Sequence, residues 1–148
     1  MKLSLVVVLS LIVGSSEWFT DFEAAREIAG KENKFLLLNF SGSDWCAPCI
    51  KMKSEVFESQ TFLSLAEEHL ILVRADFPRT KKNQLSKDQA KRNETLAEHY
   101  NPSGKFPLTL LINANGKIIK EWDGYVFGSQ GKFMNELNKL IPKQELSN

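Results

Sequence analysis

The feature that most limits the possible folds is an apolar run of strand length that passes, after a short turn, into the start of a helix. The run, Phe35 to Phe40, is apolar except for Asn39, as is typical of a central strand covered on both faces. Trp45-Cys46-Ala47-Pro48-Cys49 follows and contains both cysteines of the chain. Pro48 fits the first turn of a helix, where its missing N–H costs nothing. We therefore expect a strand, a turn and a helix that begins at Cys46.

Apolar periodicity and capping residues predict further elements on either side of this unit. In chain order they are a helix capped by Thr20 and ending at Gly30, the central strand, the cysteine helix, a short helix near Phe62, a strand at 70–75, a polar loop at 77–88, a helix capped by Ser86, strands at 106–112 and 117–122 joined by a hairpin turn at 113–116, and a helix from Ser129 to Pro142. This order predicts an α/β fold in which a mixed sheet has helices on both faces. A chain of 148 residues suffices for one such domain.

The N-terminus has the pattern of a secretory signal. Lys2 precedes the apolar run Leu3–Val13, which is followed by the small residues Gly14, Ser15 and Ser16. The run is shorter than the ~20 residues that a helix needs to cross a bilayer. We expect residues 1–16 to be a signal peptide and residues 17–148 a domain exported to the periplasm or the cell exterior, without stable membrane insertion. A short uncleaved anchor and a buried core strand are the alternatives.

The close spacing of Cys46 and Cys49 argues against a purely structural cross-link, although exported proteins often contain such links. A disulfide stabilises mainly by closing a loop of the unfolded chain, and a loop this short constrains almost nothing. At a helix N-terminus the dipole favours a thiolate. The pKa of a free thiol, near 8.5, falls to roughly 3.5–7.5 in such motifs. We expect exposed Cys46 to attack a partner disulfide and buried Cys49, one turn further on, to resolve the mixed disulfide.

The cysteine pair is also compatible with functions other than redox chemistry. A zinc site needs four ligands, and His69 and His99 lie on separate expected elements, so no metal and no cofactor are expected. A redox-silent binding module would keep the fold without the chemistry. A copper chaperone is compatible with two soft thiolates, but no methionine or histidine lies beside the pair to support it. The net charge of +1 provides no basic excess and argues against nucleic acid as a partner.

The Trp45–Cys49 segment after a buried strand, together with Phe106-Pro107 at the start of a later strand, resembles the thioredoxin superfamily. The resemblance covers most of Thr20 to Leu140 and implies a thioredoxin-like three-layer sandwich. Within the superfamily, Glu55-Val56-Phe57, Gln60-Thr61-Phe62 and the insertion at 77–88 are most similar to secreted thioredoxin-like proteins akin to the C-terminal domain of the reductase DsbD.

The resemblance also implies roles for residues outside the cysteine pair. It implies that Pro107 follows a cis peptide bond and packs against the pair, that the backbone beside Pro107 pairs with the substrate chain, and that Cys46 and Cys49 form a redox-active disulfide. Phe106 is then a candidate substrate contact, and Trp45 shapes the substrate groove. The alternative is that Phe106 and Trp45 only pack in the protein.

Two departures from the family bear on mechanism. Thioredoxins have a buried aspartate in the strand before the motif, whereas Asn39 stands at the equivalent position and cannot titrate. The turn before Cys46 is one residue longer, through Gly42, which leaves Asp44 or water as other proton acceptors. Ala47-Pro48 is nearer to the Gly-Pro of family reductants than to the histidine of its oxidants. The sequence predicts a monomeric exported oxidoreductase that reduces disulfides in other exported proteins and is itself reduced by an upstream thiol.

Overall fold

Strand β2 (Phe35–Ser41) lies at the centre of the sheet, and the turn to the cysteines leaves its C-terminal end. The computed structural model describes residues 16–141. The other strands are β1 (Trp18–Phe19), β3 (Leu70–Asp76), β4 (Leu108–Ile112) and β5 (Ile118–Asp123). The five-stranded sheet has the order β1-β3-β2-β4-β5, with β2 parallel to β3 and antiparallel to β4. The predicted mixed sheet is confirmed.

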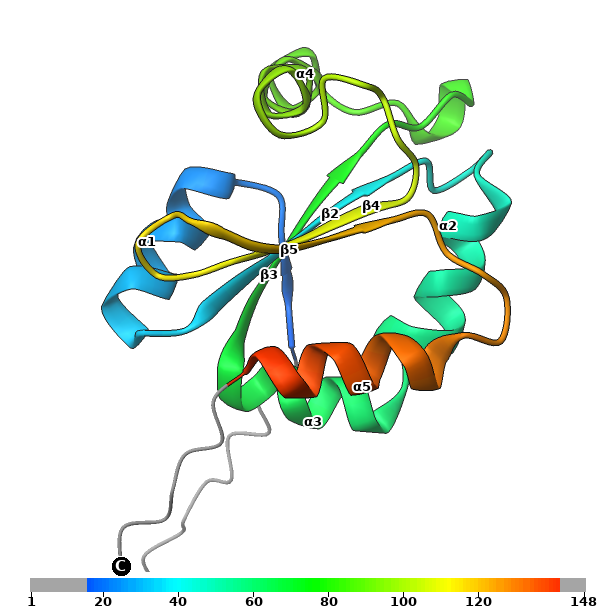
Figure 1. Cartoon of the computed structure of the whole chain (residues 1–148). Coiled ribbons are helices and arrows are strands. Elements are labelled where there is room, and N and C mark those ends of the chain that lie inside the picture. The colour runs from blue at the N-terminus through cyan, green and yellow to red at the C-terminus, as the bar shows by residue number, and fades with distance from the viewer. Residues whose placement is uncertain (1–15, 142–148) are drawn as a thin grey trace, which may run out of the picture.

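Helices cover both faces of this sheet (Figure 1). They are α1 (Phe22–Glu32), α2 (Ala47–Met52), the π-helix η1 (Lys53–Phe57), α3 (Gln60–His69), the 3-10 helix η2 (Lys81–Asn83), α4 (Lys87–Tyr100) and α5 (Gln130–Leu140). The predicted three-layer α/β sandwich is confirmed.

Alternate side chains of β2 enter two separate cores, because successive residues of a strand point to opposite faces. Leu36, Leu38 and Phe40 pack with residues of α1 and α4. Leu37 packs with α3, α5 and the helical segment that follows the cysteines. Because both faces are covered, β2 is buried from Leu36 to Ser41, which explains the continuous apolar run in the sequence.

The structure corrects two of the predicted helix caps. Helix α1 is capped by Asp21, which accepts a hydrogen bond from Ala24 N, and not by Thr20. Both residue types cap helices well, so the sequence did not distinguish them. Ser129 occupies the N-cap position of α5 but donates its hydroxyl to Val126 O instead of capping the helix.

Other expectations are confirmed or lie outside the described residues. Ser86 caps α4 by accepting from Gln89 N at 3.1 Å, and residues 113–116 form the turn between β4 and β5. Strand β1, the π-helix η1 and the 3-10 helix η2, which lies within the loop expected at 77–88, were not predicted. The expected signal segment, up to residue 15, and Pro142 lie outside the described residues. Within residues 16–141, no helix combines the length and the apolar character needed to cross a membrane.

Candidate active site

Cys46 and Cys49 are joined by a disulfide at the N-terminus of α2, with their Cα atoms 5.2 Å apart. Cys46 is the N-cap residue, and its Sγ accepts a hydrogen bond from Cys49 N at 3.3 Å. Gly42 N donates to Cys49 Sγ at 3.5 Å. In this disulfide form both residues are almost fully buried, 5% exposed for Cys46 and 4% for Cys49. The predicted contrast between an exposed and a buried cysteine is therefore absent here.

The turn before Cys46 depends on Gly42. Its carbonyl accepts from Trp45 N at 3.3 Å and from Cys46 N at 2.9 Å. A Cβ atom at this position would lie only 2.3 Å from Cε2 of the Trp45 indole. The extra turn residue noted in the sequence thus lets the indole fold back onto the backbone.

Trp45 and Phe106, two of the expected groove residues, are in contact. Their rings meet edge-on with centroids 5.4 Å apart, and Phe77 also meets Phe106 edge-on at the same separation. Trp45 Nε1 donates to Phe77 O at 2.7 Å. The Arg79 guanidinium carbon lies 3.7 Å from the centroid of the Trp45 ring. Arg79 and Phe77 belong to the insertion, and their place beside Trp45 was not predicted.

Pro107, the third expected groove residue, is buried and follows a cis peptide bond, as the resemblance implied. It directly precedes β4, whose first residue, Leu108, is paired with Phe40 near the end of β2. The proline and the cysteine turn thus lie at the same end of the sheet. The carbonyl of Pro107 accepts from Gly124 N at 2.8 Å, which joins the proline to the loop after β5.

The Asp44 carboxylate is hydrogen-bonded to residues of the insertion. Its carboxylate accepts from Thr80 Oγ1 at 2.6 Å, Arg79 N at 2.9 Å, and Thr80 N and Asn83 Nδ2, both at 3.0 Å. These hydrogen bonds, that of the Thr80 hydroxyl first, hold the pKa of Asp44 well below its usual range. An ionised carboxylate held in this way is a poor proton acceptor, which argues against the role that the sequence left open for Asp44.

Asn39 is only 2% exposed and belongs to a small polar cluster under α2. Its Nδ2 donates to Thr109 Oγ1 at 3.1 Å, and Thr109 Oγ1 contacts Met52 Sδ at 3.8 Å. A satisfied amide thus occupies the position where thioredoxins have a carboxyl. The sequence identified Asn39 but not Thr109, which faces it from the neighbouring strand β4.

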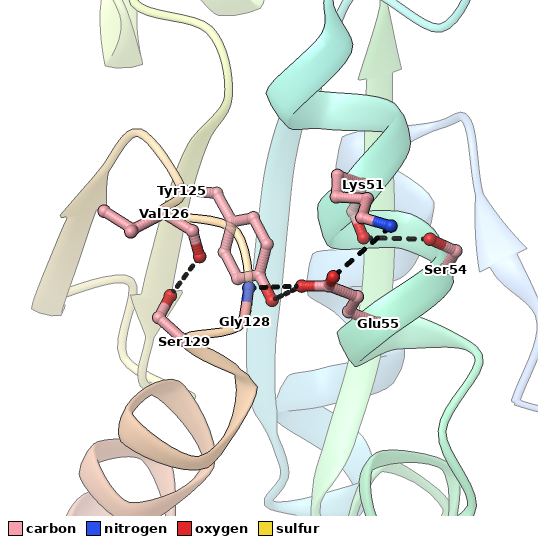
Figure 2. A network of polar contacts seen from close by, with 7 residues as sticks. All are labelled: Lys51, Ser54, Glu55, Tyr125, Val126, Gly128 and Ser129. Carbon is pink, nitrogen blue, oxygen red and sulfur yellow. Dashed lines mark hydrogen bonds and ion pairs between the residues drawn. The ribbon is translucent and has the colours of Figure 1, made fainter.

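A second polar network fastens the loop between β5 and α5 to the π-helix (Figure 2). Glu55 accepts from the Tyr125 hydroxyl at 2.5 Å and from Gly128 N at 2.9 Å, with Lys51 Nζ 3.5 Å away. These contacts, that of Tyr125 first, lower the pKa of Glu55. Desolvation and then the bond to Glu55 raise the pKa of Tyr125 to about 12. No local pattern in the sequence relates these distant residues.

The histidines lie away from the cysteine pair in the chain and have partners of their own. His69, at the end of α3, lies 3.3 Å from a Glu68 carboxylate oxygen, and His99 of α4 packs edge-on against Tyr100. Residues 16–141 contain no group of three or more His, Cys, Asp or Glu side chains arranged to hold a metal ion.

A cysteine pair closed into a disulfide at a helix N-terminus, on this sheet and with a cis-proline at the same end, defines a thioredoxin-like thiol–disulfide oxidoreductase. Residues 22–141 match the model of the family described as thioredoxin-like domain. The chain therefore belongs to this family.

Similar proteins agree with this assignment. The disulfide bond reductase DsbH of Chlamydia pneumoniae is 35% identical over 130 residues, which are 88% of this chain and 76% of that protein. A solved structure named DsbH oxidoreductase has 26% identity and a TM-score of 0.72, covering 95% of this chain and 94% of that one. The oxidised C-terminal domain of DsbD from Neisseria meningitidis, with 18% identity and a TM-score of 0.56 over 83% of this chain and 98% of that one, shares the fold. The protein is thus an oxidoreductase that exchanges disulfides with protein partners.

Proposed function

We propose that the protein reduces disulfides in other exported proteins, with Cys46 as the attacking thiol and Cys49 as the resolving thiol. The observation that carries this assignment is the hydrogen bond from Cys49 N to Cys46 Sγ, at 3.3 Å. Cys46 is the N-cap of α2, where unpaired N–H groups and the positive end of the helix dipole favour an anion. After reduction the same N–H would stabilise a Cys46 thiolate.

The reaction consists of two thiol–disulfide exchanges. The Cys46 thiolate attacks one sulfur of the partner disulfide, forms a mixed disulfide and releases the other sulfur as a thiolate. The Cys49 thiolate then attacks Cys46 Sγ and releases the remaining partner sulfur. Two electrons pass to the partner, whose thiolates take up two protons, and the Cys46–Cys49 disulfide is left. An upstream dithiol, oxidised in turn, restores the reduced pair.

Trp45, Phe106 and Pro107 are proposed to form the groove that receives the substrate chain. The edge-on contact of the Trp45 and Phe106 rings and the placement of Pro107 at the same end of the sheet support this. A substrate segment extended beside Pro107 would bring its disulfide to Cys46.

Two cysteine variants test the assignment. Cys46→Ser is expected to abolish insulin reduction, because no attacking thiol remains. Cys49→Ser is expected to accumulate mixed disulfides with its partners, which non-reducing electrophoresis detects, because the resolving thiol is missing. Circular dichroism serves as the control that both variants fold. A fully active Cys46→Ser protein contradicts the proposal.

The reducing direction is supported by Ala47-Pro48 between the cysteines and by the name of the Chlamydia pneumoniae relative, a disulfide bond reductase. Equilibration with glutathione measures the reduction potential. We expect a value nearer to that of thioredoxin, about −270 mV, than to that of DsbA, about −120 mV. A value close to that of DsbA would indicate an oxidant.

Export, and the division into a signal peptide at 1–16 and a domain at 17–148, rest on Lys2 and the apolar run that follows it. Expression of the full chain, followed by fractionation and mass spectrometry, tests both. The expected product is exported, begins near Glu17 and elutes as a monomer in size-exclusion chromatography. An uncleaved protein retained in the cytoplasm contradicts this part of the proposal.

A further inference from the structure

The part of the insertion that lies between β3 and α4, residues 77–86, is bound to the two residues that directly precede Cys46. Asp44 accepts four hydrogen bonds from Arg79, Thr80 and Asn83, and Trp45 donates one to Phe77. In Figure 1 the green 3-10 helix η2 of this insertion lies next to the cyan segment between β2 and α2. The insertion is therefore held at a fixed place beside the cysteine pair.

This part of the molecule presents a group of exposed cations, here called the basic rim. The rim consists of Arg79, Lys81, Lys82 and Lys87. None of the four forms an ion pair with another residue in 16–141, whereas lysines elsewhere, such as Lys31 and Lys105, do. Three acids lie in the same part of the molecule. Asp44 and Asp76 accept hydrogen bonds from N–H and hydroxyl groups, and Asp88 adjoins Lys87 in the first turn of α4. The four cations outnumber these three acids, so the rim has an excess of positive charge although the net charge of the whole chain is only +1.

Arg79 is the residue of the basic rim that stacks on Trp45, the neighbour of Cys46. Its guanidinium carbon lies 3.7 Å from the centroid of the Trp45 ring, a cation–π arrangement. A guanidinium stacked on a ring keeps the N–H donors in its own plane free to bind a carboxylate. Arg79 N is also bonded to Asp44 at 2.9 Å, so the backbone of this residue is fixed as well. The Arg79 guanidinium can therefore donate hydrogen bonds to an anion beside Trp45, the residue that precedes Cys46.

We propose that the basic rim is a docking surface for acidic segments of disulfide-bonded proteins, and that Arg79 determines specificity by pairing with a carboxylate beside the substrate cysteine. The inference rests on the proposed reductase function and names the class of its substrates. Complementary charge raises the rate of encounter and orients the partner, and salt screens the effect.

The test uses two synthetic peptides with the same intramolecular disulfide and the same length. One has glutamates beside its cysteines, and the other has glutamines. The measured quantity is kcat/KM for reduction of each peptide by the full chain. The peptide thiols are detected with an assay that contains no thioredoxin. We expect the glutamate peptide to be preferred at low salt by roughly 1.5- to 5-fold for each charge pair formed. The preference is expected in KM and is expected to shrink from ~20 mM to ~500 mM salt.

Variants locate the effect. Arg79→Gln and the double change Lys81→Gln/Lys82→Gln are each expected to reduce the preference for the glutamate peptide, and Arg79→Lys to retain part of it. Neither Lys81 nor Lys82 packs on Trp45, so the double variant separates charge from any disturbance of the indole. Lys139→Gln removes one positive charge from the last turn of α5, as Arg79→Gln does from the rim; it is the control and is expected to keep the full preference.

The outcomes separate this inference from the function on which it rests. If neither peptide is reduced, the proposed function itself fails. If both are reduced equally at low salt, or if Lys139→Gln lowers the preference as much as the rim variants do, the docking surface is refuted while the function stands. Binding to vesicles of phosphatidylglycerol that is lost in the rim variants, with equal reduction of the two peptides, assigns the rim to a lipid surface and also overturns the proposal.

Discussion

At the scale of single residues, Asn39 is the clearest difference from the resembled family. Its amide is buried under α2 and satisfied by Thr109 at 3.1 Å. An amide at this place neither binds nor releases a proton in the working pH range. Since Asp44 is also hydrogen-bonded to the insertion, we expect water to accept the proton of Cys49.

Replacing Asn39 with aspartate is expected to make stability depend on pH. Burial raises the pKa of a carboxyl. The pKa of the introduced carboxyl in the folded variant then lies above its unfolded value of about 3.9, so the variant is as stable as the wild type below that pH. As the pH rises, the free energy of unfolding of the variant falls, by about 1.4 kcal/mol for each unit by which the folded pKa exceeds the unfolded one. Urea denaturation at about pH 4 and about pH 8 measures this. Asn135→Asp, at an exposed site on α5, is the control, and a pH-independent loss in Asn39→Asp would contradict the explanation.

Gly42→Ala is expected to displace the indole of Trp45. The added Cβ would lie 2.3 Å from the ring, so the expected loss of stability is that of an overpacked site, about 1–3 kcal/mol. The NMR signal of Trp45 Nε1–H, which is bonded to Phe77 O, is expected to shift. Gly131→Ala on α5, where a Cβ meets nothing within 4 Å, serves as the control and is expected to be neutral or stabilising. An unshifted indole signal in Gly42→Ala would show that the turn has room for a side chain.

At the scale of elements, two long-range clamps hold loops against the segment that contains the cysteines. Asp44 fixes the insertion after β3. Glu55 fixes the loop after β5 through Tyr125 and Gly128 (Figure 2). The first residue of this loop, Gly124, donates a hydrogen bond to Pro107 O. Phe127 lies on this second loop, and 57% of its surface is exposed. Glu55 lies on the π-helix, an element often found at functional sites.

Glu55→Ala is expected to destabilise the loop after β5 in a pH-dependent way. Because the folded pKa of Glu55 is depressed, its contribution is fully present above the unfolded value of about 4.3 and is lost as the pH falls through the lower folded value. The difference in stability from the wild type should therefore shrink in acid.

The contribution of Tyr125 to stability depends on pH in the alkaline range. Its pKa is raised to about 12, so the contribution is present below pH ~10 and declines as the pH rises through the folded value.

Hydrogen exchange at Gly128 N, with denaturation from acid to neutral pH, measures the Glu55 effect. The amide, bonded to Glu55 at 2.9 Å, is expected to exchange faster in the variant. Glu67→Ala, on the exposed side of α3, removes a carboxylate that forms no hydrogen bond or ion pair with the described residues and is the control. Unchanged exchange at Gly128 would show that the loop does not depend on Glu55.

At the scale of the whole molecule, stability comes from two apolar cores separated by the sheet. Phe62 of α3 is fully buried in one of them and packs against Phe57, with ring centroids 5.1 Å apart. Phe62→Ala is expected to cost about 3–5 kcal/mol, which lowers the melting temperature by roughly 6–20 °C. Phe127→Ala, at an exposed phenylalanine, is the control and is expected to change it little. Similar melting temperatures for the two variants would contradict the assignment of Phe62 to the core.

The sequence by itself determined the elements whose signals are local. The apolar run of β2, the proline in the first turn of α2 and the cap at Ser86 each depend on neighbouring residues, so hydrophobic periodicity and capping chemistry sufficed. The order of these elements predicted a mixed sheet with helices on both faces, and the family resemblance added the thioredoxin-like architecture and the cis bond before Pro107.

Only the tertiary structure decided which distant segments meet. Asp44 and Thr80, like Glu55 and Tyr125, are separated by long stretches of chain and come together because helices and strands pack on a common sheet. Packing also buries Cys46 as deeply as Cys49 in the disulfide form. A hydrogen bond between remote residues leaves no periodic trace in a sequence, because its geometry exists only after both cores have formed.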